Sequence, residues 1–341
     1  MHVMVDKSVN LDDFWTVESM GVDVGNCDCK AKLSVVENME AKLIEESSSK
    51  VSNQWLIPLP WAKDPMHLPN NKVQATKMLN GLERRLKKNE EHGAAYQRQM
   101  EEMVEKGFAR KLEETEIKQY QGPVHYLPHH AVVRAESKST PVRIVFNSAN
   151  KCNGEAINDY WMKCPDLLNN LNGVLMRFRE REVAVCGDIS KMYHKVLIPE
   201  VDQHIHRYLW RDLDVNRPPD TYIMQVLTFG DKPAAAMAQT ALKLTAKRES
   251  EEMYPKAAQV LKNDTYMDDI CASVNNVKEA KALTEDLDII LSKGGFSIKE
   301  WISNKLLKCD VKDADDREEN EQKVLGVRWN YADDTLSLIH I

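Results

Sequence analysis

The chain has 341 residues, enough for one large domain or two, and its 43% of hydrophobic residues can form a sizeable core. Its seven cysteines are scattered without a CxxC pair, which argues against a disulfide framework or zinc ribbon and indicates reduced thiols in the cytosol or nucleus. Cys27 and Cys29 lie close together in the sequence, so metal binding by this pair is an alternative. No run of roughly 18 apolar residues and no signal-peptide pattern occurs, so we expect neither a membrane span nor secretion.

The net charge of −7 is unevenly distributed along the chain. Residues 1–50 carry ten acids and five bases, and residues 310–323 carry seven acids and three bases. Residues 72–111, in contrast, hold ten bases and six acids. This modest basic bias is consistent with phosphate contact, and a solvated helix face is the alternative interpretation.

The first third of the chain divides into three segments. Residues 1–50 are polar and acidic, which indicates a leader or linker that is partly disordered and contains at most one helix. Residues 54–71 hold four prolines and no helical period, which predicts extended chain. Residues 72–118 predict two helices broken near residues 91–96, with Gly107 ending the second.

From residue 123 onward, short β-like runs alternate with helices. Residues 124–134 and 141–148 predict a hairpin. Residues 182–190 predict an apolar strand that ends at an acid, and residues 204–210 and 221–230 predict a second strand pair. Residues 233–250, with Pro233 in the first turn, predict a helix.

The last third continues the same alternation. Apolar residues from Val277 to Leu291 recur at helical spacing, with Asn276 as the N-cap and Gly294 after the last turn. Residues 296–302 and 323–329 each predict a strand. The whole pattern predicts an α+β fold around an antiparallel sheet.

Two adjacent carboxylates, Asp268 and Asp269, lie in the sequence YMDD. Close like charges raise each other's pKa, so a cation is expected nearby. Asp188 ends the strand 182–190, and if that strand pairs beside the YMDD hairpin, Asp188 and Asp268 converge. Such carboxylates can bridge two divalent ions in phosphoryl transfer, and oxygen ligands favour Mg²⁺. The alternative is a solvated turn, with Asp188 as a helix N-cap.

Five segments in order resemble the motifs of reverse transcriptases. They are DISKMYHKVLI (188–198), FGDKPAAA (229–236), YMDD (266–269), GGFSIKEWISN (294–304) and VLGVRW (324–329). PVRIVFNSA, LPWAKDPMHLPNN and GGFSIKEWISN resemble the Pao/BEL group of long-terminal-repeat retrotransposons in particular. The resemblance covers roughly residues 50–330.

This resemblance implies a right-hand polymerase whose palm is an antiparallel sheet backed by helices, with a ferredoxin-like core. The domains would be a leader (1–50), an extended segment plus helices (51–122), fingers (123–181), a palm with a fingers insert (182–323) and the start of a primer-grip hairpin (324–341). The thumb would be missing, as would the ribonuclease H, protease and integrase regions, so the chain resembles a fragment of a polyprotein.

The resemblance also implies a two-metal site. Asp188 and Asp268 would be the main ligands of two Mg²⁺ ions, with Mn²⁺ as a substitute, and Asp269 would complete the cluster. The backbone carbonyl of Ile189 would add a ligand. Lys299 could protonate the departing pyrophosphate, with a solvent-facing strand lysine as the alternative.

The nucleotide would be held by residues from several motifs. Tyr193 would exclude a ribose 2′-OH, unless it is simply a core tyrosine, and Gly230 would allow close backbone approach. Arg143, Arg134 and Lys138 would reach the triphosphate from the fingers hairpin, although Lys138 could equally be plain surface.

Two positions depart from the family pattern. Phe229 stands where retroviral enzymes carry Gln, so nucleotide and template selection is expected to be looser. Asn147 stands where an Asp is usual, which removes a charge from the fingers motif.

The expected function is RNA-directed DNA polymerase, with an RNA or DNA template, a primer strand and dNTPs as partners, in cytoplasmic virus-like particles or the nucleus. A catalytically silent nucleic-acid-binding remnant is the alternative. A palm-fold nucleotide cyclase would leave FGDKP and GGFSIKEW unexplained.

Overall fold

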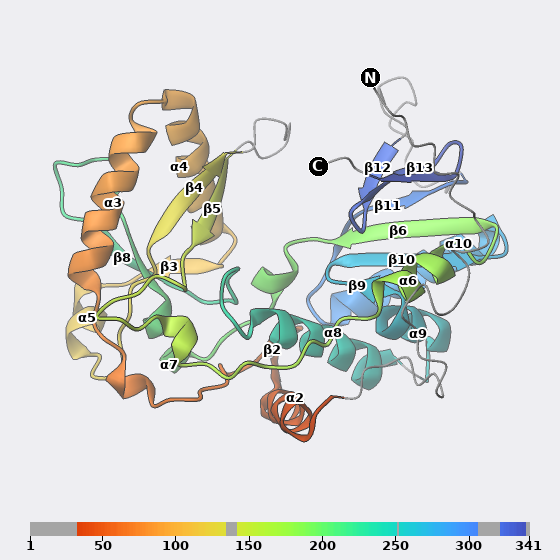
Figure 1. The fold of residues 1–341 in the computed structure, drawn as a ribbon, viewed down its shortest axis with the longest axis horizontal. Helices are drawn as coiled ribbons and strands as arrows, with labels where there is room; N and C mark the ends of the chain where they lie inside the picture. The colour runs from red at the N-terminus through yellow and green to blue at the C-terminus, as the bar shows by residue number, and fades with distance from the viewer. Residues whose placement is uncertain (1–32, 134–141, 251, 306–320, 339–341) are drawn as a thin grey trace, which may run out of the picture. The chain divides into compact units, whose positions relative to one another are not determined.

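The computed structural model describes residues 33–133, 142–250, 252–305 and 321–338. Every element described below belongs to one compact unit that begins at Val35. The named strands pair antiparallel with one another and alternate with helices along the chain (Figure 1). The fold is therefore α+β, as the sequence predicts. None of the helices in the described ranges has the length and apolar character needed to cross a membrane.

Before residue 182, the described residues form helices, short strands and two 3₁₀ turns. In chain order they are α2 (Val35–Ser47), β1 (Ser49–Val51), β2 (Gln54–Leu56), η1 (Pro65–His67), α3 (Lys72–Leu86), α4 (Glu90–Glu105), β3 (Ala109–Lys111), α5 (Glu114–Gln119), β4 (His129–Val133), β5 (Val142–Phe146), η2 (Ile157–Asp159) and α6 (Leu171–Phe178).

The remaining elements supply most of the sheets. They are β6 (Val183–Ile189), η3 (Met192–Lys195), α7 (Glu200–Gln203), η4 (His204–His206), β7 (Arg207–Trp210), β8 (Asp220–Met224), α8 (Ala234–Ser250), α9 (Pro255–Asn263), β9 (Thr265–Tyr266), β10 (Asp269–Val274), α10 (Val277–Lys293), β11 (Ile298–Ser303), β12 (Glu321–Val324), β13 (Val327–Asn330) and β14 (Thr335–Leu338).

The break between α3 and α4 lies earlier than the sequence predicts. It falls at residues 87–89, and Gly93 lies inside α4. The side chain of Asn89 accepts a hydrogen bond from the His92 amide at 3.0 Å, which satisfies a free donor at the helix start. The predicted end at Gly107 is confirmed, because Gly107 has a positive φ of 69°. Residues 109–111, which follow this helix end, form β3, a strand that was not predicted from the sequence.

A four-stranded sheet in the order β11-β6-β10-β9 carries the three acids of interest. Alternate residues of β6 face opposite sides of this sheet. Val183 and Val185 join the core that contains α8, α9 and α10, whereas Ala184 and Cys186 join a second cluster with Phe178 of α6. Figure 1 shows α8, α9 and α10 gathered beside this sheet. Both faces are therefore covered, which makes the sheet a rigid support.

A second group of elements lies away from this sheet in Figure 1. Helices α3 and α4 contact the hairpin β4–β5 and the sheet β3-β8-β7. A buried ion pair links them, because Arg211, just after β7, donates to Glu83 of α3 at 2.6 and 2.9 Å. Helix α2 packs on α8, with Ile44 buried.

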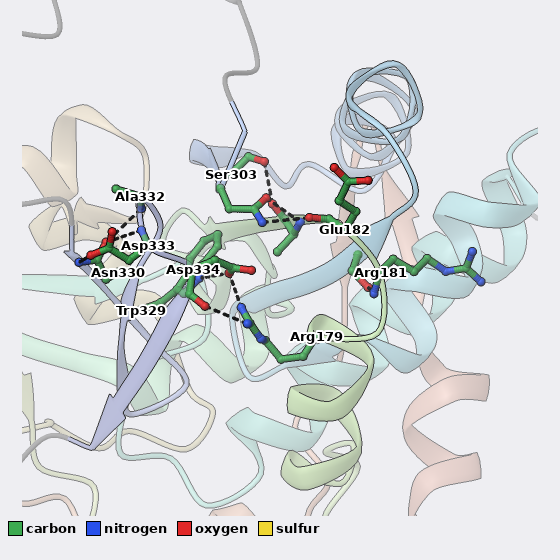
Figure 2. A network of polar contacts seen from close by, with 12 residues as sticks. Arg179, Arg181, Glu182, Ser303, Trp329, Asn330, Ala332, Asp333 and Asp334 are labelled. Atoms are coloured by element: carbon green, nitrogen blue, oxygen red, sulfur yellow. Dashed lines mark hydrogen bonds and ion pairs between the residues drawn. The ribbon is translucent and has the colours of Figure 1, made fainter.

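The C-terminal sheet β12-β13-β14 docks on the end of α6. The ring of Trp329 meets Phe178 edge-on at 4.9 Å, and the Trp329 indole donates to Asp334 at 3.0 Å. Arg179 forms an ion pair with the same carboxylate (Figure 2). The segment 323–329, predicted as one strand and by resemblance as the start of a hairpin, forms β12 and β13 around a turn. Leu325 and Gly326 both have positive φ, as a tight two-residue hairpin turn requires.

Candidate active site

The antiparallel register of β6 and β10 brings two carboxylates together. Asp188 is directly paired with Asp269, so both side chains project from the same face of the sheet. Asp268 lies in the adjoining turn, where its carbonyl accepts a hydrogen bond from the Ile189 amide at 2.7 Å. The sequence predicted that Asp188 would converge with Asp268, and the register places Asp269 opposite it with Asp268 next along the chain.

The turn that carries Asp268 is conformationally unusual. Met267 and Asp268 connect Tyr266 to its partner Asp269, and Met267 has a φ of +55°. A positive φ at this position suits a type II′ turn, which normally has glycine there. Gln239 of α8 donates to the Met267 carbonyl at 2.9 Å and holds the turn in place. The strained backbone is thus fixed by a buried helix, and such strain is typical of functional sites.

Burial and mutual repulsion act on the two acids of the turn. Burial, followed by the charge of Asp188, raises the pKa of Asp268 above its usual value. Burial and the charge of Asp268 raise the pKa of Asp269 to about 6, against a hydrogen bond from the Leu325 amide to its Oδ2 at 3.3 Å. The cluster would therefore be stabilised by a nearby cation.

Lys299 of β11 provides one positive charge. Its ammonium donates to Asp188 Oδ2 at 2.8 Å. The register of β11 on β6 shifts between Ile298 and Trp301, which face Ile189 and Gly187 respectively. Lys299 and Glu300 therefore lie together opposite Asp188, as in a β-bulge, which re-aims side chains.

The donor atoms of the three acids are carboxylate oxygens, which suit a hard divalent ion. Asp188 Oδ1 is buried and has no hydrogen-bond partner within the described part of the chain, so this ligand oxygen is uncommitted there. In the described ranges, no three or more histidine, cysteine or acidic side chains are arranged to hold a metal ion. Mg²⁺, however, is usually bound by one or two carboxylates together with substrate phosphates and water, and the residues present fit that mode.

An aromatic pair lies beside the acids. Tyr193 of η3 and Phe229 have ring centroids 4.4 Å apart, and Phe229 is 52% exposed. Burial and then the charge of Asp268 raise the pKa of the Tyr193 hydroxyl, so that carboxylate and the phenol interact electrostatically. Tyr193 is half-buried and packs against the core, so it combines a structural contact with a position next to the acids.

The glycine after Phe229 approaches another backbone closely. Gly230 has a φ of +105°, and a Cβ at this position would lie 3.0 Å from the Phe146 carbonyl oxygen of β5. The Gly230 carbonyl accepts a hydrogen bond from the Asn158 side-chain Nδ2 at 3.0 Å. The side chain of Asn158 also accepts from the Lys232 amide at 2.9 Å, so the loop is tied at both ends.

A buried ionic network fixes the same loop. Asp231 accepts from Ser148 at 2.5 Å and from Thr228 at 2.6 Å, and its other contact is His206 Nε2 at 2.9 Å. Burial alone would lower the pKa of His206, but the Asp231 charge outweighs it and raises the pKa. Burial alone would raise the pKa of Asp231, but the charge of His206 and the hydrogen bonds from His206, Ser148 and Thr228 lower it. His206 and Asp231 therefore form an imidazolium–carboxylate pair.

Of the remaining predicted nucleotide-binding residues, the structure describes only Arg143, which lies on the hairpin β4–β5. Arg143 is exposed on β5, opposite Val132. Figure 1 shows β5 separated from β6 and β10. Arg134 and Lys138 lie outside the described residues. Their roles, like those of the acids, Ile189 and Lys299, stay predictions.

Three contributors to this region were not found from the sequence. Gln239 supports the YMDD turn, Leu325 donates to Asp269, and Asp231 anchors the loop after Phe229. Gln239 lies in a segment correctly predicted as a helix, and only its buried position within that helix could have indicated it. Leu325 acts through its backbone amide, which side-chain chemistry does not reveal.

The chain is similar to a solved structure of low sequence identity. No protein-family model matches the chain, and no curated protein matches it. A solved structure of the foamy viral protease–reverse transcriptase in complex with double-stranded DNA is similar over 70% of this chain, with 15% sequence identity and a TM-score of 0.46. The match covers 33% of the foamy viral chain, so this chain spans about a third of its length.

Proposed function

We propose that this chain is the catalytic core of an RNA-directed DNA polymerase that transfers a nucleotide from a dNTP to a primer 3′-OH. The observation that carries the proposal is the pairing of Asp188 with Asp269 across β6 and β10, with Asp268 at the adjoining turn. The raised pKa values of Asp268 and Asp269 indicate a group of acids that needs a cation. On the sequence motifs, we further assign the chain to the Pao/BEL type.

Asp188 and Asp268 would hold two Mg²⁺ or Mn²⁺ ions, and the Ile189 carbonyl would add a ligand. When bound, the ions would lower the pKa of the primer hydroxyl and neutralise charge on the phosphates. The rigid sheet and the turn held by Gln239 keep the carboxylates in place, so little reorganisation is needed during the reaction. Asp269 supports the cluster while accepting from the Leu325 amide.

The aromatic pair suits recognition of a deoxynucleotide. Tyr193 lies next to Asp268 and packs on Phe229, whose ring is about half exposed. We propose that the Tyr193 ring occupies the space a ribose 2′-OH would need. The positive φ of Gly230 and the buried Asp231 network keep Phe229 at a fixed place beside it.

Phosphate contacts are assigned to basic residues around the site. Arg143, Arg134 and Lys138 are proposed to bind the triphosphate, since guanidinium groups match phosphate oxygens in a bidentate manner. Lys299 is proposed to donate a proton to the leaving pyrophosphate. The template strand, primer and dNTP are the proposed partners, and longer polyprotein segments are proposed to complete the enzyme.

The test is primer extension on an RNA template with dNTPs and Mg²⁺. Purified wild-type chain is compared with Asp268→Asn and with Asp286→Asn, a control that removes an acid from α10. We expect incorporation by the wild type and by the control, and a loss of about a hundred- to thousandfold in Asp268→Asn, as is typical when transition-state charge stabilisation is removed.

Extension by Asp268→Asn at the wild-type rate would contradict the proposal. Salt-dependent binding of an RNA–DNA duplex by a folded wild-type chain, without any incorporation, would favour a silent nucleic-acid-binding remnant instead. Circular dichroism and thermal unfolding of each variant separate loss of activity from loss of folding.

A further inference from the structure

The lysine that contacts Asp188 is aimed by an irregularity in the sheet. From Ile298 to Trp301 the chain advances three residues, whereas the paired positions Ile189 and Gly187 on β6 are two apart. The extra residue on β11 places Lys299 opposite Asp188. The resulting ion pair has an N–O distance of 2.8 Å.

The neighbouring residues fix this arrangement. A Cβ on Gly187 would lie 2.6 Å from the ring of Trp301, so the indole lies directly over the glycine backbone. The Trp301 indole donates to Asp288 of α10 at 3.1 Å, which ties β11 to a helix. Lys299 is thus held opposite Asp188 by packing on its C-terminal side and by strand pairing at Ile298.

The ion pair leaves part of Asp188 available. Lys299 contacts Oδ2, while Oδ1 is buried and has no hydrogen-bond partner among the residues that the structure describes. The Lys299 side chain is 59% exposed and that of Asp188 is 38% exposed, so the pair is expected to be weak and readily exchanged. A stronger cation could therefore replace the ammonium at modest cost.

We propose that Lys299 is the resident counter-ion of Asp188 in the metal-free chain, and that a divalent ion displaces it on binding. This inference rests on the proposed two-metal function. Lys299 neutralises one of three clustered acids until the metal arrives, and its displacement frees the ammonium from Asp188. Lys299 thereby weakens metal binding, since its positive charge must be moved before a second cation can occupy the same carboxylate.

Calorimetric titration with Mn²⁺ tests the inference without any activity measurement. The full-length wild type is compared with Lys299→Met and Lys299→Gln, which remove the charge, and with Lys305→Met. Lys305 is the matched control. It lies just beyond β11, and its Nζ is 3.9 Å from Oε1 of Glu182, which precedes β6 at the end away from Asp188. We expect both Lys299 variants to bind Mn²⁺ about two- to fivefold more tightly than the wild type, and the control to be unchanged.

A second readout follows the ammonium directly. Reductive ¹³C-methylation of the lysines retains their charge, and the Lys299 signal is assigned by its absence in Lys299→Met. Saturation with Mg²⁺ should move this signal toward the position of freely exposed lysines.

The outcomes separate this inference from the proposed function. Equal or weaker Mn²⁺ affinity in the folded Lys299 variants, or a Lys299 signal that does not move when Mg²⁺ binds, would overturn the displacement alone. Failure of the wild type and both variants to bind Mn²⁺ would overturn the displacement and the two-metal site together.

Discussion

Asp269→Asn is expected to stabilise the metal-free chain at neutral pH. The substitution preserves size and an oxygen that can accept from the Leu325 amide, and it removes one of three clustered negative charges. Burial and the charge of Asp268 raise the pKa of Asp269 from 3.8 to about 6 in the folded chain. The folded state therefore binds a proton more readily than the unfolded state between these values, and stability falls as the pH rises through that window.

The size of the effect follows from the pKa. A change from 3.8 to about 6 would correspond to about 3 kcal/mol of destabilisation at neutral pH for a fully buried group. Asp269 is only half-buried, so solvent screens part of this, and we expect Asp269→Asn to gain about 1–2 kcal/mol at pH 7.5. The gain should vanish near pH 4, where the wild-type carboxyl is already protonated in the folded chain.

Urea unfolding in EDTA at both pH values measures this gain, with Asp286→Asn as the control for removing a negative charge. Addition of Mg²⁺ should stabilise the wild type more than Asp269→Asn, because ion binding to the folded state adds to its stability. A variant that is less stable than the wild type at pH 7.5, or that gains equally at both pH values, would refute the electrostatic reasoning.

Three further predictions concern core packing and the two buried ion pairs. Gly187→Ala should destabilise the chain by about 1–3 kcal/mol in urea unfolding, because its Cβ would meet the Trp301 ring; an unchanged midpoint would contradict the contact. Glu83→Gln should cost about 3 kcal/mol, because it leaves the Arg211 charge without its buried partner, and a loss below about 1 kcal/mol would argue against a buried pair. Asp231→Asn should lower the pKa of His206 toward the value set by burial alone, and an unchanged imidazole pKa in an NMR titration would contradict the ion pair.

Local signals in the sequence were sufficient for the elements that carry the acids. The apolar run before Asp188 predicted β6, and the helical spacing after Asn276 predicted α10 together with its cap, whose side chain accepts from the Glu279 amide at 3.0 Å. These features depend on periodicity and on hydrogen bonds between near neighbours, so one sequence suffices to indicate them.

Features that depend on contacts between distant segments were not predicted. The pairing of Asp188 with Asp269 depends on strand register, and a shift of one residue would turn every side chain to the other face. The bulge at Lys299 and the contact of Asp231 with His206 depend likewise on how strands and loops meet. Helices α6 and α9 were not predicted, and they are among the shorter α-helices described.

The proposed function requires that the acids on β6 and at the YMDD turn hold divalent ions. Anomalous diffraction from crystals grown with Mn²⁺, a primer–template duplex and a dNTP tests it most directly. We predict anomalous peaks within about 2.0–2.3 Å of carboxylate oxygens of Asp188 and Asp268, with Lys299 no longer bonded to Asp188. A bound dNTP with no anomalous peak at these carboxylates, and with the Lys299–Asp188 pair intact, would contradict the account.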